Sequence, residues 1–217
     1  MQKFIERQNL AHYKDLLAVE TDARLIEVLR TLLKTTERTL ALLESSESGA
    51  FSNAQLMRDR HLPRATPKEV SRFQHEFETS DRPFLLLKPG PGLHIVDIND
   101  AYAAATLTER AKVAGEKLFD VFPDNPDDPA ADGVSMLFHS LKIVSESGQP
   151  HEMARQRYDV RDARGVFVTK YWQPRNTPLL DDTGRLLFIL HHVEDVTARV
   201  EAALAAETNT KVSAARP

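Results

Sequence analysis

Histidine side chains offer the widest range of chemistry in this sequence, because an imidazole can ligate haem iron, bind a metal or titrate near neutral pH. The stretch Gly133–Ser147 has helical periodicity and contains one histidine, His139. At about 100° per residue, His139 lies about 200° around that helix from Leu137, which begins the apolar stripe continued by Leu141 and Val144. We therefore expect His139 on the polar face, solvated rather than bound to iron.

His191 and His192 are adjacent in a run that reads as a strand. Successive side chains point to opposite faces of a strand, so one of the two rings can reach the interior and titrate there. The simpler interpretation is a histidine held by hydrogen bonds within the sheet. The histidines show no i, i+4 helical pair beside a carboxylate, so we expect no metal site.

The acidic residues do not form a catalytic or metal-binding pattern. Asp124, Asp127, Asp128 and Asp132 cluster, but their segment lacks the glycine and the terminal glutamate of a calcium loop, which predicts a solvated loop. The string Gln74-His75-Glu76-Phe77 is similar to the phospho-accepting box of histidine kinases, yet no glycine-rich ATP-binding segment accompanies it. The motifs G-x-S-x-G, H-E-x-x-H and the P-loop are also absent, so we predict no catalytic residue.

Composition narrows the classes of protein further. The absence of cysteine excludes disulfides, zinc–thiolate sites, iron–sulfur clusters and cysteine nucleophiles. The formal net charge is −4 with both signs interspersed, which argues against a nucleic-acid partner. No apolar run approaches the roughly 18–20 residues of a membrane span, and the first ten residues carry charges rather than an apolar signal segment. We expect a cytoplasmic protein with no membrane partner.

The elements that must position these side chains begin with two helices. Leucines recur at helical spacing through residues 5–44, and Thr21 and Asp22 can cap the second helix, so residues 1–46 should form an antiparallel hairpin. Its apolar seams need cover, either from the rest of the chain or from a second copy. Residues 47–80 read as a linker followed by a flanking helix, which starts after Thr66 and ends near Thr79.

Strand patterns dominate after Pro83. Two strands are followed by short helices, by the helix Gly133–Ser147 and by three more strands, an order that predicts an α+β fold with one five-stranded antiparallel sheet and helices on one face. The predicted strands are Phe84–Lys88, Leu93–Ile98, His151–Val160, Val166–Leu180 and Arg185–Val193. The last strand is apolar on both faces, so its second face must be covered by the flanking helix, the hairpin or a partner subunit.

This order resembles the PAS fold, a family of sensory domains. Five strings of the sequence, in chain order, are similar to elements of that family: His94–Tyr102, Gly115–Pro123, Tyr171–Pro178, Asp181–Arg185 and Glu194–Thr197. The resemblance implies a PAS domain over residues 81–198, followed by an exit helix and polar tail over residues 199–217. It also implies that Asp195 and Thr197 form the joint through which a signal leaves the sheet, because their oxygens can hold the first amides of that helix.

PAS domains commonly sense through a pocket between the sheet and its helices, and the resemblance makes several residues candidates for its wall: Phe122, Leu137, Leu141, Tyr171, Trp172 and His191. Tyr171 and Trp172 face opposite ways on one strand, so one of them should point inward, where plain core packing is the alternative to a ligand contact. Without cysteine, flavin adducts and cysteine-linked chromophores are excluded. The identity of any cofactor stays open.

The sequence therefore favours a non-catalytic module of signal transduction, which binds a small ligand or a partner and relays its state through protein–protein contacts. We expect a homodimer and a signalling protein as its partners, as in two-component systems. Two alternatives remain: a redox or gas sensor that carries haem or noncovalent flavin, and the sensory fragment of a histidine kinase.

Overall fold

The computed structural model describes residues 1–52, 74 and 77–214. The chain begins with helices α1 (Gln2–Val19) and α2 (Ala23–Ser48) and continues with strands β1 (Phe84–Leu87) and β2 (Ile95–Ile98). Four helices follow: α5 (Asp100–Thr106), α6 (Arg110–Val113), α7 (Leu118–Val121) and α8 (Gly133–Ser147). The remaining elements are β3 (His151–Glu152), β4 (Gln156–Arg157), β5 (Val160–Arg161), β6 (Phe167–Val168), β7 (Tyr171–Leu180), β8 (Leu186–Asp195) and α9 (Thr197–Ala214).

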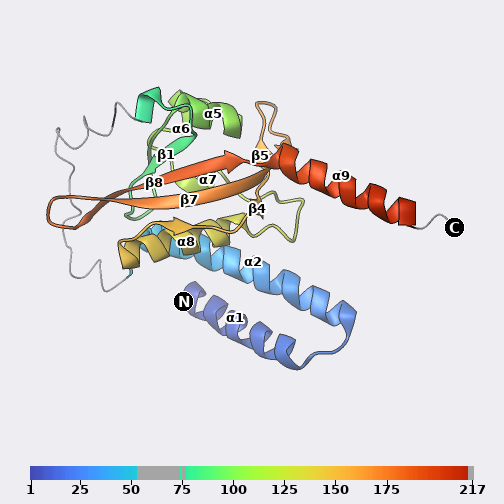
Figure 1. The fold of residues 1–217 in the computed structure, drawn as a ribbon. Helices are drawn as coiled ribbons and strands as arrows, with labels where there is room; N and C mark the ends of the chain where they lie inside the picture. Colours follow the sequence, from blue (N-terminus) through green and yellow to red (C-terminus); the bar gives the residue numbers. More distant parts are fainter. Residues whose placement is uncertain (53–73, 75–76, 215–217) are drawn as a thin grey trace.

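The sheet is antiparallel, with strand order β2-β1-β8-β7-β3 and with β4 also paired to β7 (Figure 1). The predicted α+β class and antiparallel sheet are therefore confirmed. The long strands β7 and β8 form a hairpin at its centre, closed by a turn at the predicted Asp181–Arg185 segment.

The predicted strand His151–Val160 is in fact interrupted. Glu152 pairs with Arg175, but Gln156 pairs with Trp172, so three residues of one strand oppose two of the other. Such a bulge fits Pro174, which has no N–H to donate to the sheet. The predicted strand Val166–Leu180 is divided as well, because its first part, β6, pairs with β5 in a separate two-stranded hairpin.

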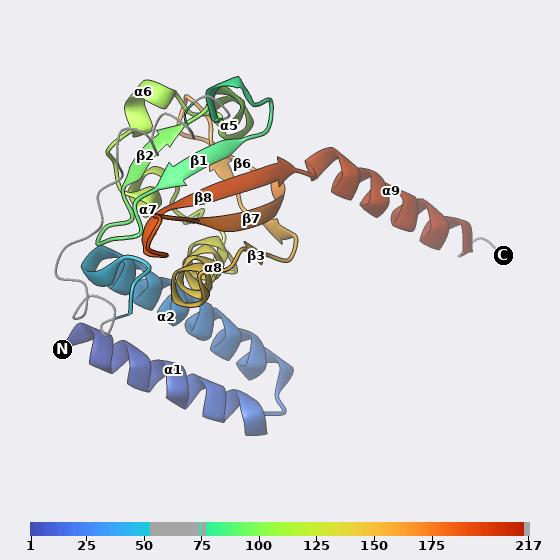
Figure 2. The same cartoon turned by 60° about the vertical axis from the view of Figure 1, so that its left-hand side comes forward.

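Helix α8 lies between the sheet and the amino-terminal hairpin, and both views show this layering (Figures 1 and 2). Helix α2 buries Thr36, Leu40, Ala41 and Ser45. The hairpin thus packs on its own domain, on the helical side of the sheet. Of the two covers predicted for the apolar seam of α2, the rest of the chain and a second copy, the structure shows the first. The hairpin does not cover the outer face of β8, for which the flanking helix and a partner subunit remain the predicted covers.

Ion pairs reinforce this contact between α2 and the rest of the domain. Arg38 Nε lies 2.7 Å from Asp124 Oδ2, and Glu44 Oε2 lies 3.3 Å from Lys142 Nζ on α8. The Asp124 side chain is almost completely buried and also accepts a hydrogen bond from Val134 N at 3.0 Å, so it caps the start of α8. The prediction of a solvated loop is therefore wrong for Asp124, because this carboxylate joins two helices.

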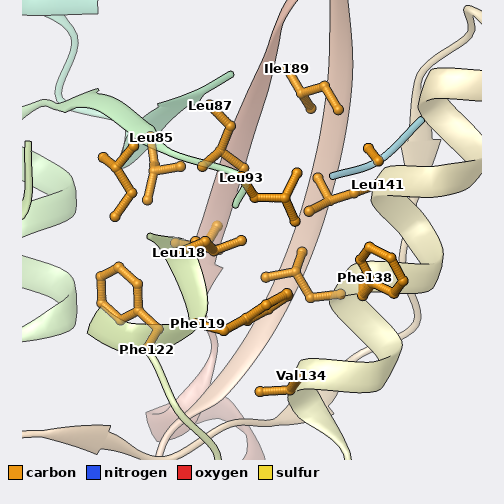
Figure 3. Packing of buried hydrophobic residues seen from close by; sticks show 14 of the residues in the cluster. Leu85, Leu87, Leu93, Leu118, Phe119, Phe122, Val134, Phe138, Leu141 and Ile189 are labelled. Atoms are coloured by element: carbon orange, nitrogen blue, oxygen red, sulfur yellow. The ribbon is translucent and has the colours of Figure 1, made fainter. Parts of the chain in front are cut away.

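Buried side chains of α8 meet those of α7 above the sheet. Figure 3 shows Val134 and Leu141 projecting from α8 toward the region of Leu118 and Phe119. The rings of Phe119 and Phe138 meet edge to face, with their centroids 6.4 Å apart. All five belong to one cluster of buried apolar residues, which also includes Ala41 of α2 and Ala50. Because residues of the hairpin and its junction share this core, burial of their apolar surface stabilises both parts together.

Asn99 anchors the start of the domain. Its side chain is fully buried, and Oδ1 accepts hydrogen bonds from Phe84 N at 3.0 Å and from Tyr102 N at 2.9 Å. Its Nδ2 donates to Arg82 O at 2.8 Å, with Phe77 O and Ser80 O within 3.3 Å. Asn99 therefore caps α5, since Tyr102 N is in the first turn of that helix.

Gly49 makes the junction between α2 and the sheet possible. Its φ of +62° and ψ of −142° are accessible essentially to glycine, and a Cβ there would lie 2.0 Å from Gly90 O. Two backbone hydrogen bonds cross the same junction, from Ala50 N to Pro89 O at 2.8 Å and from Gly92 N to Ser45 O at 2.8 Å. Backbone hydrogen bonds therefore hold the end of α2 against the β1–β2 turn.

We expect Gly49→Ala to lower the free energy of unfolding by more than about 3 kcal/mol, because it combines a forbidden backbone conformation with a steric clash. Gly148→Ala is the matched control, since Gly148 also ends a helix with positive φ but has no atom near its missing Cβ. It should cost only about 1–2 kcal/mol. Urea denaturation of both variants measures the difference, and equal losses would contradict the close approach at Gly49.

Candidate functional site

A small cavity of about 40 Å³ lies between the inner face of the sheet and the helices α5, α7 and α8. Strands β7 and β8 form one wall, and the short segment β4–β5 closes one side. Twelve side chains line it: Tyr102, Thr106, Leu118, Phe122, Leu137, Gln156, Tyr158, Val160, Trp172, Pro174, His191 and Val193. Most are apolar, as in sites for small molecules, with a few polar groups that can orient a ligand.

Four of the six residues proposed from the sequence meet around this cavity: Phe122, Leu137, Trp172 and His191. Leu141 does not, because it lies one turn farther along α8, where Figure 3 shows it beside Leu93 and away from Phe122. Tyr171 does not either, since its side chain points away from the face that carries the buried Trp172. That these four residues contact a ligand remains a prediction.

Sequence reasoning missed several lining residues, and the reasons differ. Tyr102 ends one of the strings that resemble PAS elements, so that string contained the signal. Nothing in the sequence placed Gln156 and Tyr158 at the cavity, because the residues around them were predicted as one continuous strand. The bulge opposite Pro174 sets which of their side chains turn inward, and a bulge is a property of strand pairing rather than of local sequence.

The cavity wall carries no ionised side chain at neutral pH. None of its residues is Asp, Glu, Lys or Arg. Burial, with a smaller contribution from the neighbouring His192, lowers the pKa of His191 to about 3, so that its ring is neutral. Burial likewise raises the pKa of Tyr102 and of Tyr158, and both hydroxyls keep their protons.

A chain of hydrogen bonds leads from the cavity wall along the inner face of the sheet to Ser140 of α8 and His151 of β3. His191 Nδ1 lies 2.8 Å from Asn176 Oδ1, Asn176 Nδ2 donates to Ser140 Oγ at 2.7 Å, and Ser140 Oγ lies 2.8 Å from His151 Nδ1. Because Asn176 offers its oxygen to His191, the imidazole proton is on Nδ1 and Nε2 is an acceptor. His191 is therefore a hydrogen-bonded sheet histidine, as the simpler interpretation of the sequence expects.

The cavity wall contains a buried polar atom without a hydrogen-bond partner among the described residues. Gln156 Oε1 is buried and accepts no hydrogen bond from the described residues. An unsatisfied buried acceptor costs about 1–3 kcal/mol, so a native structure seldom leaves one without reason. Gln156 and Tyr158 also line a polar cleft of about 390 Å³ outside the cavity, between α2, the loop at Asp124–Asp132 and the segment 154–159.

A flavin or a haem does not fit this cavity, because pockets for molecules of that class measure about 300–1,000 Å³ and this one measures about 40 Å³. His139 is exposed on α8, as the sequence predicts, and therefore does not face the cavity. Among the described residues, no group of three or more His, Asp or Glu side chains could hold a metal ion. In the string that is similar to a histidine-kinase box, His75 and Glu76 lie outside the described residues.

Asp195 and Thr197 form a joint between the sheet and α9. Asp195 Oδ1 accepts from Thr197 N at 2.9 Å, and its Oδ2 accepts from Lys170 Nζ at 2.6 Å. Burial raises the pKa of Asp195, but the hydrogen bonds from Lys170 and Thr197 outweigh it, and the net pKa lies below its ordinary value. Thr197 Oγ1 accepts from Tyr171 N at 3.0 Å, so this hydroxyl binds the sheet rather than the helix.

The neutral state of His191 predicts how stability depends on pH. Its pKa falls from 6.5 in the unfolded chain to about 3 in the folded one. The contribution of His191 to folding stability is therefore complete above the unfolded pKa and is lost as the pH falls toward 3. Between about pH 7 and pH 4.5 this residue should account for a loss of about 2–3 kcal/mol. His191→Gln should remove that part of the slope in urea denaturation across this range. An unchanged slope would show that His191 is not buried as a neutral ring.

Comparison with known proteins places this geometry in a family. The family model described as the PAS fold matches residues 77–201, which is more than half of the chain. No curated protein matches. Among solved structures, the PAS domain of the fruit-fly ELK potassium channel is 15% identical, with coverage of 59% of this chain and 97% of that one and a TM-score of 0.45.

Two bacterial structures are similar at the same level. The Rhodobacter sphaeroides LOV protein is 11% identical, with coverage of 60% of this chain and 69% of that chain and a TM-score of 0.47. The PAS domain of Bordetella pertussis BvgS is 15% identical, with coverage of 66% and 98% and a TM-score of 0.40. On the match of the family model, together with the antiparallel sheet and its covering helices, the chain belongs to the PAS fold family and contains a sensory, signalling domain.

Proposed function

We propose that this protein is a non-catalytic sensor, which binds a small ligand in the cavity and relays its occupancy to a signalling protein through α9 and the amino-terminal hairpin. One observation supports the proposal most directly. Strands β7 and β8 carry the cavity wall on their inner face and the joint to α9 at their end, and Trp172 of the wall is paired directly with Asp195 of the joint.

The backbone of Tyr171 couples the two features. Its N–H donates to Thr197 Oγ1 at 3.0 Å, and its carbonyl accepts from Val196 N at 2.9 Å. A shift of β7 at Trp172 therefore moves the residue that holds both the last part of β8 and the first part of α9. Helix α9 projects away from the domain in both views, where a partner can read its orientation (Figures 1 and 2).

A second route leads from the cavity to the hairpin. The Tyr158 hydroxyl donates to Phe122 O, and both residues line the cavity. Two residues later, Asp124 binds Val134 N of α8 and Arg38 of α2. A change in the position of Phe122 would therefore reach α2 through a partly buried ion pair, which salt screens less than an exposed one.

We also propose that the hairpin forms a homodimer. The part of α1 and α2 nearest their connecting loop leaves large apolar side chains exposed: Leu16, Val19, Leu25, Val28 and Leu32. A second copy would bury these side chains and gain hydrophobic stabilisation in proportion to the apolar area covered. This closed end of the hairpin and α9 extend from the same side of the domain, so one partner surface can contact both (Figure 1).

Xenon gas, which binds small apolar cavities, can test the relay without a known ligand. In ¹⁵N-labelled protein, xenon should shift the Trp172 indole resonance and the amide resonances of the first turn of α9. Thr197→Val removes the acceptor for Tyr171 N, so the shifts should persist at Trp172 and shrink severalfold in α9. Thr177→Val, on the same strand, is the matched control and should leave both responses intact. Shifts in α9 that survive Thr197→Val would contradict the relay.

Native mass spectrometry of the full chain tests the homodimer and reports any retained small molecule at once. We expect two copies, and we expect Val28→Asp to weaken their association by a factor of about 10 or more, because it places a charge in an apolar contact. Glu27→Ala, its exposed neighbour, should have little effect. A monomer at micromolar concentration, or a dimer indifferent to Val28→Asp, would contradict the proposed role of the hairpin.

A further inference from the structure

We propose that the ligand of the cavity is an uncharged molecule of about four non-hydrogen atoms that donates a hydrogen bond to Gln156 and passes the side chain of Gln156 to enter. Short-chain alcohols and primary amides have this chemistry. The inference deepens the proposed sensory function and rests on it, since it specifies which class of molecule the same cavity takes.

The absence of charge follows from the lining residues. A buried ion needs an opposite charge or several hydrogen bonds, because its desolvation is otherwise very costly. None of the twelve lining residues is Asp, Glu, Lys or Arg, and the His191 ring is neutral. The charged groups nearby, such as Arg157 and Asp159, line the outer cleft and are paired with each other at 2.7 Å. The cavity therefore favours a neutral ligand over a carboxylate or an amine of the same size.

The size follows from the volume. A water molecule needs about 10–15 Å³ of such space, so the cavity of about 40 Å³ has room for about three waters. A molecule of about four non-hydrogen atoms occupies a similar space. Larger ligands would have to displace Phe122, Leu137 or Trp172, all of which are buried in the core cluster.

The hydrogen-bond donor follows from the polar atoms that remain free. Thr106 Oγ1 already bonds Tyr102 O at 2.8 Å, the Tyr158 hydroxyl bonds Phe122 O, and His191 Nδ1 bonds Asn176. Gln156 Oε1 is a buried acceptor of the cavity wall that the described residues leave unsatisfied, and it can bond only a donor. The Tyr102 hydroxyl, which also makes no hydrogen bond to the described residues, can donate to the same ligand.

The entrance follows from the two sets of lining residues. Gln156 and Tyr158 line both the cavity and the outer cleft, so they separate the two spaces. Tyr158 is fixed in place: its hydroxyl bonds Phe122 O, its carbonyl accepts from Trp172 Nε1 at 2.8 Å, and its ring covers Gly133, where a Cβ would lie 1.7 Å away. The Gln156 side chain has no hydrogen bond to the described residues, and so it is the member of the pair that can swing aside.

Two isosteric probes isolate the hydrogen bond: 2-propanol donates one, whereas acetone only accepts. Titration of the ¹⁵N-labelled full chain, followed at the Trp172 indole, should give 2-propanol an affinity about two- to tenfold higher than that of acetone. Acetate, of similar size but charged, should bind at least tenfold more weakly than 2-propanol. In Gln156→Leu the preference for 2-propanol over acetone should disappear, whereas the control Gln149→Leu, exposed beyond the end of α8, should retain it.

Xenon separates the possible failures. If xenon shifts the Trp172 indole but acetone binds as well as 2-propanol, the ligand class is wrong and the cavity still functions as a site. If neither xenon nor the solvents shift that resonance, the proposed sensory function of the cavity fails with it. Binding of xenon to Gln156→Leu also shows that this variant is folded; if it is not folded, the order of the three probes in the wild type still decides the inference.

Discussion

The buried side chain of Asn99 joins segments that are far apart in the chain. The relative positions of the segment before β1, of β1 itself and of α5 depend on its hydrogen bonds. One amide group bonds the backbone before β1, the first residue of β1 and the first turn of α5. A side chain that accepts two hydrogen bonds and donates to nearby carbonyls leaves little freedom to any of these segments, because each would otherwise bury an unsatisfied backbone group. The position of α5, and with it Tyr102 in the cavity wall, follows from this constraint.

Helix α8 plays a comparable part for the whole molecule. One of its sides packs on the sheet and the other on α2, and Asp124 binds an amide of its first turn, Val134 N, as well as Arg38. The hairpin is therefore continuous with the core of the domain, and Gly49 closes the other end of this contact by letting the backbone of α2 approach the β1–β2 turn. A displacement of α8 would therefore act directly on both the sheet and the amino-terminal hairpin.

The two central strands connect the cavity wall with the start of α9. Their inner face forms the wall of the cavity and their end holds α9, with Trp172 and Asp195 directly opposite each other. Strand pairing gives this arrangement its precision, because a residue that moves on β7 takes its hydrogen-bonded partner on β8 with it. The bulge opposite Pro174 turns Gln156 toward the same cavity, so an irregularity in the sheet contributes a buried acceptor, Gln156 Oε1, that no described residue satisfies.

Periodicity and capping residues determined much of this molecule directly from the sequence: the helical hairpin with a cap at Thr21 or Asp22, the helix Gly133–Ser147 and the central strands. These features depend on neighbours within a few residues, so local sequence is sufficient to predict them. The division of His151–Val160, the absence of Leu141 and Tyr171 from the cavity wall and the inclusion of Gln156 depend on register and on which turn of a helix faces which strand. Only the tertiary structure decided those, because strand pairing and helix packing join residues whose separation along the chain carries no local signal.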